Sequence, residues 1–199
     1  MIGLNSSFAF SAAFLISYVS GIVEPIALND NNSIYIGILF SITSAVAAIL
    51  SIVFAYLAQR TGKGIILTIG SLSFFMVGFM FIWFPNIEDQ WNQSLLVILF
   101  TLQGVGRATF ESTLRATYAD MFSHEKEGAF ANIIFQNGGT STLIFFMTTI
   151  ITPFAFQILI MVSSIGAIWG YWKAFFIFKF EQDVLSHASL LSPEEIDNI

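Results

Sequence analysis

The feature that most constrains this chain is a series of long apolar runs separated by short polar loops. A run of about 20 apolar residues can cross a hydrocarbon core of about 30 Å as one α-helix. Six such runs predict transmembrane helices at residues 4–23, 34–58, 65–84, 95–114, 129–150 and 154–176. We therefore expect an all-α, polytopic membrane protein, with a six-helix bundle over residues 1–178.

The remaining residues, 179–199, are more polar, and we expect them to form a cytoplasmic tail. Near its end, Ser192 and Pro193 precede two glutamates, a pattern typical of the first turn of a helix. The sequence therefore predicts a short surface helix starting there.

Composition supports the membrane assignment and excludes several function classes. The chain is 56% hydrophobic and 10% charged, whereas about 25% of residues are charged in an ordinary soluble domain. There is no Cys, which excludes disulfides, thiolate metal sites and thiol catalysis. No Ser-His-Asp set and no pair of carboxylates is evident, and no basic patch resembles a nucleic-acid interface. We expect the lipid bilayer as a partner, and no enzymatic activity, cofactor, metal site or nucleic acid.

The basic residues predict the orientation of the bundle. Lys and Arg follow the predicted second and fourth helices and the end of the sixth, whereas the loops after the first, third and fifth have none. Loops rich in Lys and Arg stay in the cytoplasm. With an even number of spans, both termini are expected to be cytoplasmic. The residues concerned are Arg60, Lys63, Arg115, Lys126, Lys173 and Lys179.

The predicted fourth helix carries charges into the membrane. Its apolar part before Arg107 is only about a dozen residues long, too short to cross a bilayer. The helix must therefore continue to about Leu114 and include Glu111. A charged side chain at the centre of a helix costs about 2.5–3.5 kcal/mol on insertion scales, so these two residues call for an explanation.

Polar side chains recur every four residues on one face of each of two neighbouring helices. On the fourth helix they are Gln103, Arg107, Glu111 and Arg115, and on the fifth they are Asn132, Gln136 and Thr140, with Asn137 beside them. The two helices are expected to be antiparallel. Counting inward from their shared loop places Glu111 level with Asn132, and Arg107 level with Gln136.

Three interpretations of this polar set remain open. The residues could line a polar cavity or gate, or they could form a structural network in which Arg107 pairs with Glu111 and the amides cap the pair. Buried ion pairs are compatible with both. A proton relay through Glu111 is less favoured, because an adjacent Arg keeps the carboxylate ionised. We favour the structural network.

Two motifs resemble a known family. The turn at residues 58–63 resembles the cytoplasmic turn of the major facilitator superfamily, which runs Gly, three residues, Asp-Arg, one residue, Gly-Arg-Lys. The residues that fit are Arg60, Gly62 and Lys63. Gln59 replaces the usual Asp, and the opening Gly is missing, which weakens the case for the charge-relay gate of that family.

The middle of the chain resembles the Unc-ninety-three-like branch of the superfamily, also called ion channel regulatory proteins. The matching elements are Gly104-Val105-Gly106-Arg107, Phe110-Glu111, Arg115-Ala116, Tyr118-Ala119-Asp120 and the stretch from Gly128 to Asn132. The resemblance implies a fold of two six-helix halves, with this chain corresponding to the C-terminal half. In that superfamily the substrate site lies between the halves.

Three functions follow from the resemblance and the polar residues. The chain could be a regulatory or trafficking subunit that binds another membrane protein, half of a secondary transporter for a small solute, or a structural companion in a larger complex. The departures in the turn motif, and the lack of a second acidic residue in the core, favour the regulatory subunit. The expected partner is another membrane protein or a second six-helix half.

Overall fold

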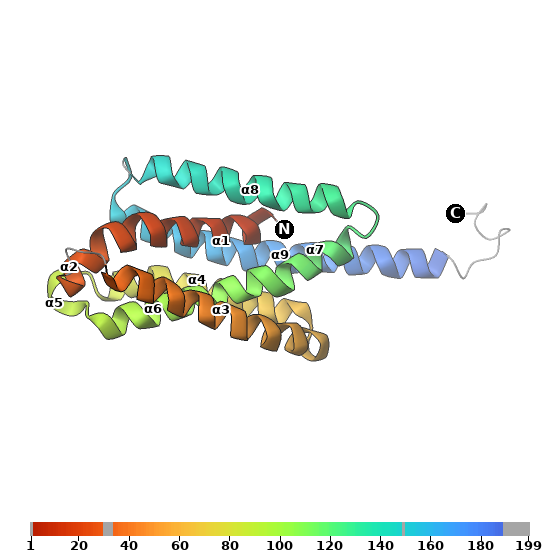
Figure 1. Ribbon diagram of the computed structural model, residues 1–199. Coiled ribbons are helices and arrows are strands. Elements are labelled where there is room, and N and C mark those ends of the chain that lie inside the picture. Colours follow the sequence, from red (N-terminus) through yellow and green to blue (C-terminus); the bar gives the residue numbers. More distant parts are fainter. Residues whose placement is uncertain (1, 30–33, 149, 189–199) are drawn as a thin grey trace.

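The computed structural model describes residues 2–29, 34–148 and 150–188, and all regular structure in these ranges is helical. The elements are α1 (Ile2–Phe14), η1 (Leu15–Val23), α2 (Glu24–Leu28), α3 (Ile34–Thr61), α4 (Lys63–Trp83), α5 (Ile87–Gln90), α6 (Gln93–Thr109), η2 (Phe110–Leu114), α7 (Arg115–Met121), α8 (Lys126–Met147) and α9 (Pro153–Ala188). Figure 1 shows the long helices lying side by side along one axis. The predicted all-α fold is therefore confirmed.

Four helical segments are long and apolar enough to cross a membrane, as expected of an integral membrane protein. They are Gly3–Leu28, Ile34–Thr61, Lys63–Trp83 and Pro153–Phe180. The two other long helices are the continuous helix α6–η2–α7 and helix α8. These carry the polar residues singled out in the sequence, which lowers their mean hydropathy.

Several helices extend beyond their predicted ends. The first helix was expected to end at residue 23, but it continues through Pro25 and the rest of α2 to Leu28, and the following Asn29 has a left-handed φ of 51°. The π-helical turns of η1 precede the proline, and such local adjustments accommodate the backbone groups that a proline frees. Helix α9 continues to Ala188, so residues 179–188 of the predicted tail are helical (Figure 1). The helix predicted at Ser192 lies outside the described residues.

Helix α6 packs closely between α3 and α4. A Cβ atom on Gly104 would lie 2.9 Å from the carbonyl oxygen of Thr43 on α3. A Cβ atom on Gly106 would lie 2.1 Å from the ring of Phe74 on α4. Small residues at helix contacts allow backbones to approach in membranes, where lipid provides no hydrophobic drive between helices.

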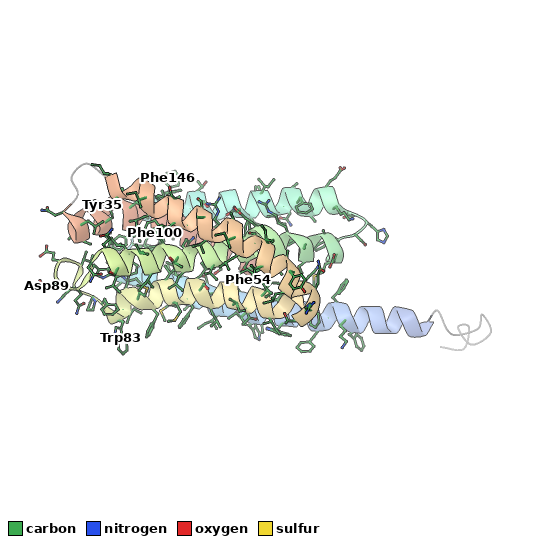
Figure 2. The ribbon with its side chains drawn as sticks, turned by 60° about the horizontal axis from the view of Figure 1, so that its bottom comes forward. Tyr35, Phe54, Trp83, Asp89, Phe100 and Phe146 are labelled. Atoms are coloured by element: carbon green, nitrogen blue, oxygen red, sulfur yellow. The ribbon has the colours of Figure 1, made fainter. Side chains whose placement is uncertain are left out.

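The two ends of the bundle differ in charge. One end holds the α3–α4 turn, α7, the start of α8 and the last part of α9. These elements lie together there, since Lys63, Asp120 and Phe178 line one surface hollow. Every Lys and Arg of the chain except Arg107 belongs to these elements, so we call this the basic end. The opposite end holds α2 and α5, with Asp89 exposed on its rim (Figure 2).

The outer surface of the bundle is apolar. Large hydrophobic side chains project from α3, α4, α8 and α9, for example Ile52 at 75% exposure, Phe135 at 78% and Trp169 at 68%. Figure 2 shows Trp83 projecting away from the bundle at the end of α4. A soluble domain would bury such residues, whereas hydrocarbon tails solvate them.

Candidate functional site

A polar cavity of about 220 Å³ opens on one side of the bundle. Its walls come from α1, η1, α3, α6, η2, α7 and α8, whereas no residue of α4 or α9 lines it. Its polar lining consists of Thr43, Gln103, Arg107, Glu111, Arg115 and Asn137. Four of the six site residues predicted from the sequence therefore meet in one cavity.

The predicted pairing of Arg107 with Glu111 is present. Nε of Arg107 donates a hydrogen bond of 2.8 Å to Oε1 of Glu111 one turn later, and the two side chains are 41% and 36% exposed. A guanidinium has five N–H donors. This is the one hydrogen bond of Arg107 within the described parts of the chain, so its other donors remain open to the cavity.

Arg115 continues the same face toward the basic end. Its guanidinium carbon lies 5.7 Å from the centre of the Phe110 ring, a cation–π contact. No carboxylate in the described ranges lies within ion-pair distance of Arg115. The cavity therefore holds two guanidiniums and one carboxylate, and its net charge is positive.

Gln103 serves as a link between helices. Its side chain is 2% exposed, and its Oε1 accepts a hydrogen bond of 2.6 Å from the hydroxyl of Ser11 on α1. This bond joins α6 to α1 at the inner wall of the cavity. Gln103 therefore acts mainly in packing.

The amides of α8 bond to α1 instead of the charged pair. Asn5 Nδ2 donates to the carbonyl of Ile133 at 2.7 Å and to Oε1 of Gln136 at 3.3 Å. Nε2 of Gln136 donates in turn to Oδ1 of Asn132 at 2.9 Å, within α8. Among the residues that the structure describes, no hydrogen bond joins these amides to Arg107 or Glu111.

The expected capping of the charged pair by these amides is therefore not found. Counting along two helices gives the depth of each residue but not the lateral neighbour of each helix. Helix α8 lies against α1 and α7, and α1 separates most of its length from α6 (Figure 1). Asn137 alone of the predicted α8 residues reaches the cavity lining.

Sequence reasoning missed the polar stripe of α1. Besides Asn5 and Ser11, the hydroxyl of Ser7 lies 3.3 Å from that of Ser164 on α9, and Thr140 on α8 donates to Ser6 at 3.4 Å. Together these bonds tie α1 to α6, α8 and α9. The signal was visible as closely spaced Asn and Ser residues at the start of the first apolar run.

The turn residues Arg60, Gly62 and Lys63 lie together at the basic end. Gly62 has a φ of 90°, in the left-handed region that favours glycine, and joins α3 to α4. Lys63 forms an ion pair with Asp120 and donates to the carbonyl of Ala116 at 3.3 Å, which docks the turn on α7. Arg60 instead stacks on Tyr56 of its own helix, 4.8 Å from the ring centre.

Tyr118 is a buried residue of α7, two positions before Asp120. Its side chain is 3% exposed and its ring stacks on Phe122 with centres 5.9 Å apart. The role of Tyr118 is therefore packing.

Two π-helical segments border the cavity. Leu15 and Ile16 of η1, and Phe110 and Glu111 of η2, all belong to its lining. A π-turn widens the helix, changes the direction of the side chains that follow and occurs frequently at functional sites. The apolar runs of the sequence carry no signal for these segments.

No known family model matches the chain, and no solved structure matches it significantly. The cavity is therefore interpreted from its own residues and geometry.

Proposed function

We propose that this chain is a non-enzymatic regulatory or partner-binding membrane subunit. Its bundle crosses the bilayer six times, with both termini in the cytoplasm, and it resembles the C-terminal half of an Unc-ninety-three-like major facilitator protein. The partner is another membrane protein or a second six-helix half, and it covers the side of the bundle on which the polar cavity opens.

The observation that carries this proposal is the one-sided polar cavity. Its walls come from four of the six long helices, while α4 and α9 contribute nothing. Halves of the superfamily face each other across such a side, with the site between them. A chain whose charged residues gather on one side of a bundle has one side suited to a partner and the others suited to lipid.

The cost of exposing charges to lipid tails also favours a partner on the cavity side. Arg107 and Glu111 are each more than one-third exposed, and Arg115 is exposed. Placing the charge of Arg107 or Glu111 against hydrocarbon tails costs about 2.5–3.5 kcal/mol each on insertion scales. A polar counterpart over the cavity removes this cost, whereas lipid tails do not.

Glycines on α3 and α8, two of the helices that line the cavity, would allow close approach of a partner helix. A Cβ atom on Gly37 of α3, or on Gly138 or Gly139 of α8, would meet nothing within 4 Å. Packing inside this chain therefore does not require glycine at these positions. Small residues on helix surfaces are typical of helix–helix contacts in membranes.

Half of a secondary transporter is the second candidate. The open donors of Arg107, in a cavity of about 220 Å³, favour it, because they could bind a small anionic or polar solute. In this reading the second half completes the solute site. If neither partner binding nor solute flux depends on the cavity, the remaining candidate function is structural support of a larger complex.

Site-specific photo-crosslinking tests the proposal. A benzophenone amino acid at Ser44 on α3 or Gly138 on α8, both exposed beside the cavity, is expected to crosslink to a protein. The matched controls are Leu72 on α4 and Val162 on α9, exposed at 49% and 60% on the other side. Equal protein crosslinking from all four positions would contradict a partner on the cavity side.

A flux assay separates the two candidates. The chain reconstituted with its crosslinked partner is expected to give no solute uptake into vesicles if it is a regulatory subunit. Uptake that disappears in the Arg107→Gln variant would instead support the transporter.

A further inference from the structure

The polar cavity is amphipathic along the axis of the bundle. Helix α6–η2–α7 runs toward the basic end, so Arg115 lies nearest that end and Arg107 lies about 12 Å deeper, at 1.5 Å per residue. Helix α1 runs the opposite way, so Leu15 and Ile16 lie farther from the basic end than Phe8, which stacks on Phe110 at 3.9 Å. The lining is therefore cationic toward the basic end and apolar toward the middle of the bundle.

The cationic part has unused binding capacity. Arg115 has no carboxylate partner in the described residues, and Arg107 uses one of its five donors on Glu111. A guanidinium binds phosphate through two parallel hydrogen bonds. Basic pockets between transmembrane helices on the cytoplasmic side bind the headgroups of anionic lipids.

We propose that the polar cavity binds one anionic phospholipid from the leaflet at the basic end. Arg115, nearer the end of the bundle, binds the phosphate, and the open N–H donors of Arg107 bind the ester oxygens below it. One acyl chain lies along Ile16 and Phe40. This binding rests on the proposed crossing of the membrane, with the basic end at one leaflet, and not on the identity of the partner.

The apolar lining argues for a lipid over a soluble anion. Ile16 is 51% exposed beside the cavity, and Phe40 lines its α3 wall. These side chains offer nothing to free phosphate, whereas an acyl chain would cover them. Binding of a phospholipid should therefore depend on Ile16 and Phe40, whereas binding of free phosphate should not.

Native mass spectrometry of the full chain tests the proposal. The protein is reconstituted in nanodiscs of equal phosphatidylcholine and phosphatidylglycerol, extracted gently, and the retained lipids are counted. Wild type is expected to retain one phosphatidylglycerol. The Arg115→Gln variant is expected to lose about tenfold in affinity, since hydrogen bonds to charged groups are worth about that factor or more.

The matched control is Arg60→Gln, which removes the same charge at the same end but outside the cavity, where Arg60 stacks on Tyr56. It is expected to retain phosphatidylglycerol as wild type does. Equal retention by Arg115→Gln and Arg60→Gln, or equal retention of phosphatidylcholine, would overturn the proposal.

A second pair of variants tests the acyl chain. Ile16→Ser lies in the cavity lining, and Ile22→Ser, at 48% exposure on the same element η1, lies outside it. Only the first is expected to weaken retention. Displacement of the lipid by millimolar glycerol phosphate, with no difference between the two isoleucine variants, would show a soluble-anion site and overturn the lipid assignment.

Discussion

Replacement of Gly106 by alanine tests the packing of α6, on which the position of the cavity depends. The new Cβ would lie 2.1 Å from the Phe74 ring, whereas carbon atoms in good contact lie about 3.5–4.0 Å apart. Phe74 is 4% exposed, and the adjoining hollow of about 10 Å³ is too small to accept a displaced ring. The ring and the helices beside it must therefore move.

The magnitude follows from two opposing terms. Overpacking a well-packed core costs about 1–3 kcal/mol. Replacing a helical glycine by alanine contributes about 1 kcal/mol in the opposite direction. The control is Gly166→Ala on α9, which gains the same helical term and meets nothing within 4 Å. We expect Gly106→Ala to be less stable than Gly166→Ala by about 1–3 kcal/mol, near the upper end because the overlap is severe.

Unfolding by dodecyl sulfate in mixed micelles, followed by the fluorescence of the four tryptophans and by circular dichroism, measures this difference. Equal free energies of unfolding for the two alanine variants would refute the close packing of α6 against α4. The location of the cavity walls would then need revision.

Three further substitutions have defined outcomes. Ser11→Ala leaves the buried Oε1 of Gln103 without its donor, so it is expected to lower the free energy of unfolding in micelles by about 0.6–1.7 kcal/mol. The control is Ser41→Ala, which removes an exposed hydroxyl bonded within its own helix and should leave the free energy of unfolding unchanged. A double-mutant cycle on Lys63 and Asp120 should give a coupling free energy of about 1 kcal/mol or less, because water and salt screen exposed ion pairs. A larger coupling would show that this ion pair holds the α3–α4 turn on α7 more firmly than its exposure implies. Arg107→Leu removes the charge that the partner is proposed to cover, so it should disturb assembly with the partner, and normal assembly would contradict a role for the cavity side.

The sequence was sufficient to predict the positions of the long helices, because apolar runs of membrane length leave the backbone no other way to satisfy its hydrogen bonds. Helix ends were less predictable. Polar residues such as Arg60 continue a helix beyond the apolar run, and α9 likewise continues past the predicted sixth span. The pairing of Arg107 with Glu111 was predictable because residues four apart share a helix face.

Lateral neighbours could not be predicted. Depth counting paired α8 with α6, but α1 bonds to α8 through Asn5 and to α6 through Ser11. The docking of Lys63 on Asp120 joins residues 57 positions apart, which periodicity cannot reveal. The π-helical segments were also unpredictable, since they change backbone geometry without changing the apolar pattern.

The central claim is that α6–η2–α7 and α8 cross the membrane with their charged and polar residues. Single cysteines in this cysteine-free chain, at Asp89, His124 and Thr152, test it most directly with a membrane-impermeant maleimide. These positions lie in the segments before α6, between α7 and α8, and before α9. The account predicts that His124→Cys labels from the side opposite to Asp89→Cys and Thr152→Cys. Labelling of all three from one side would contradict it.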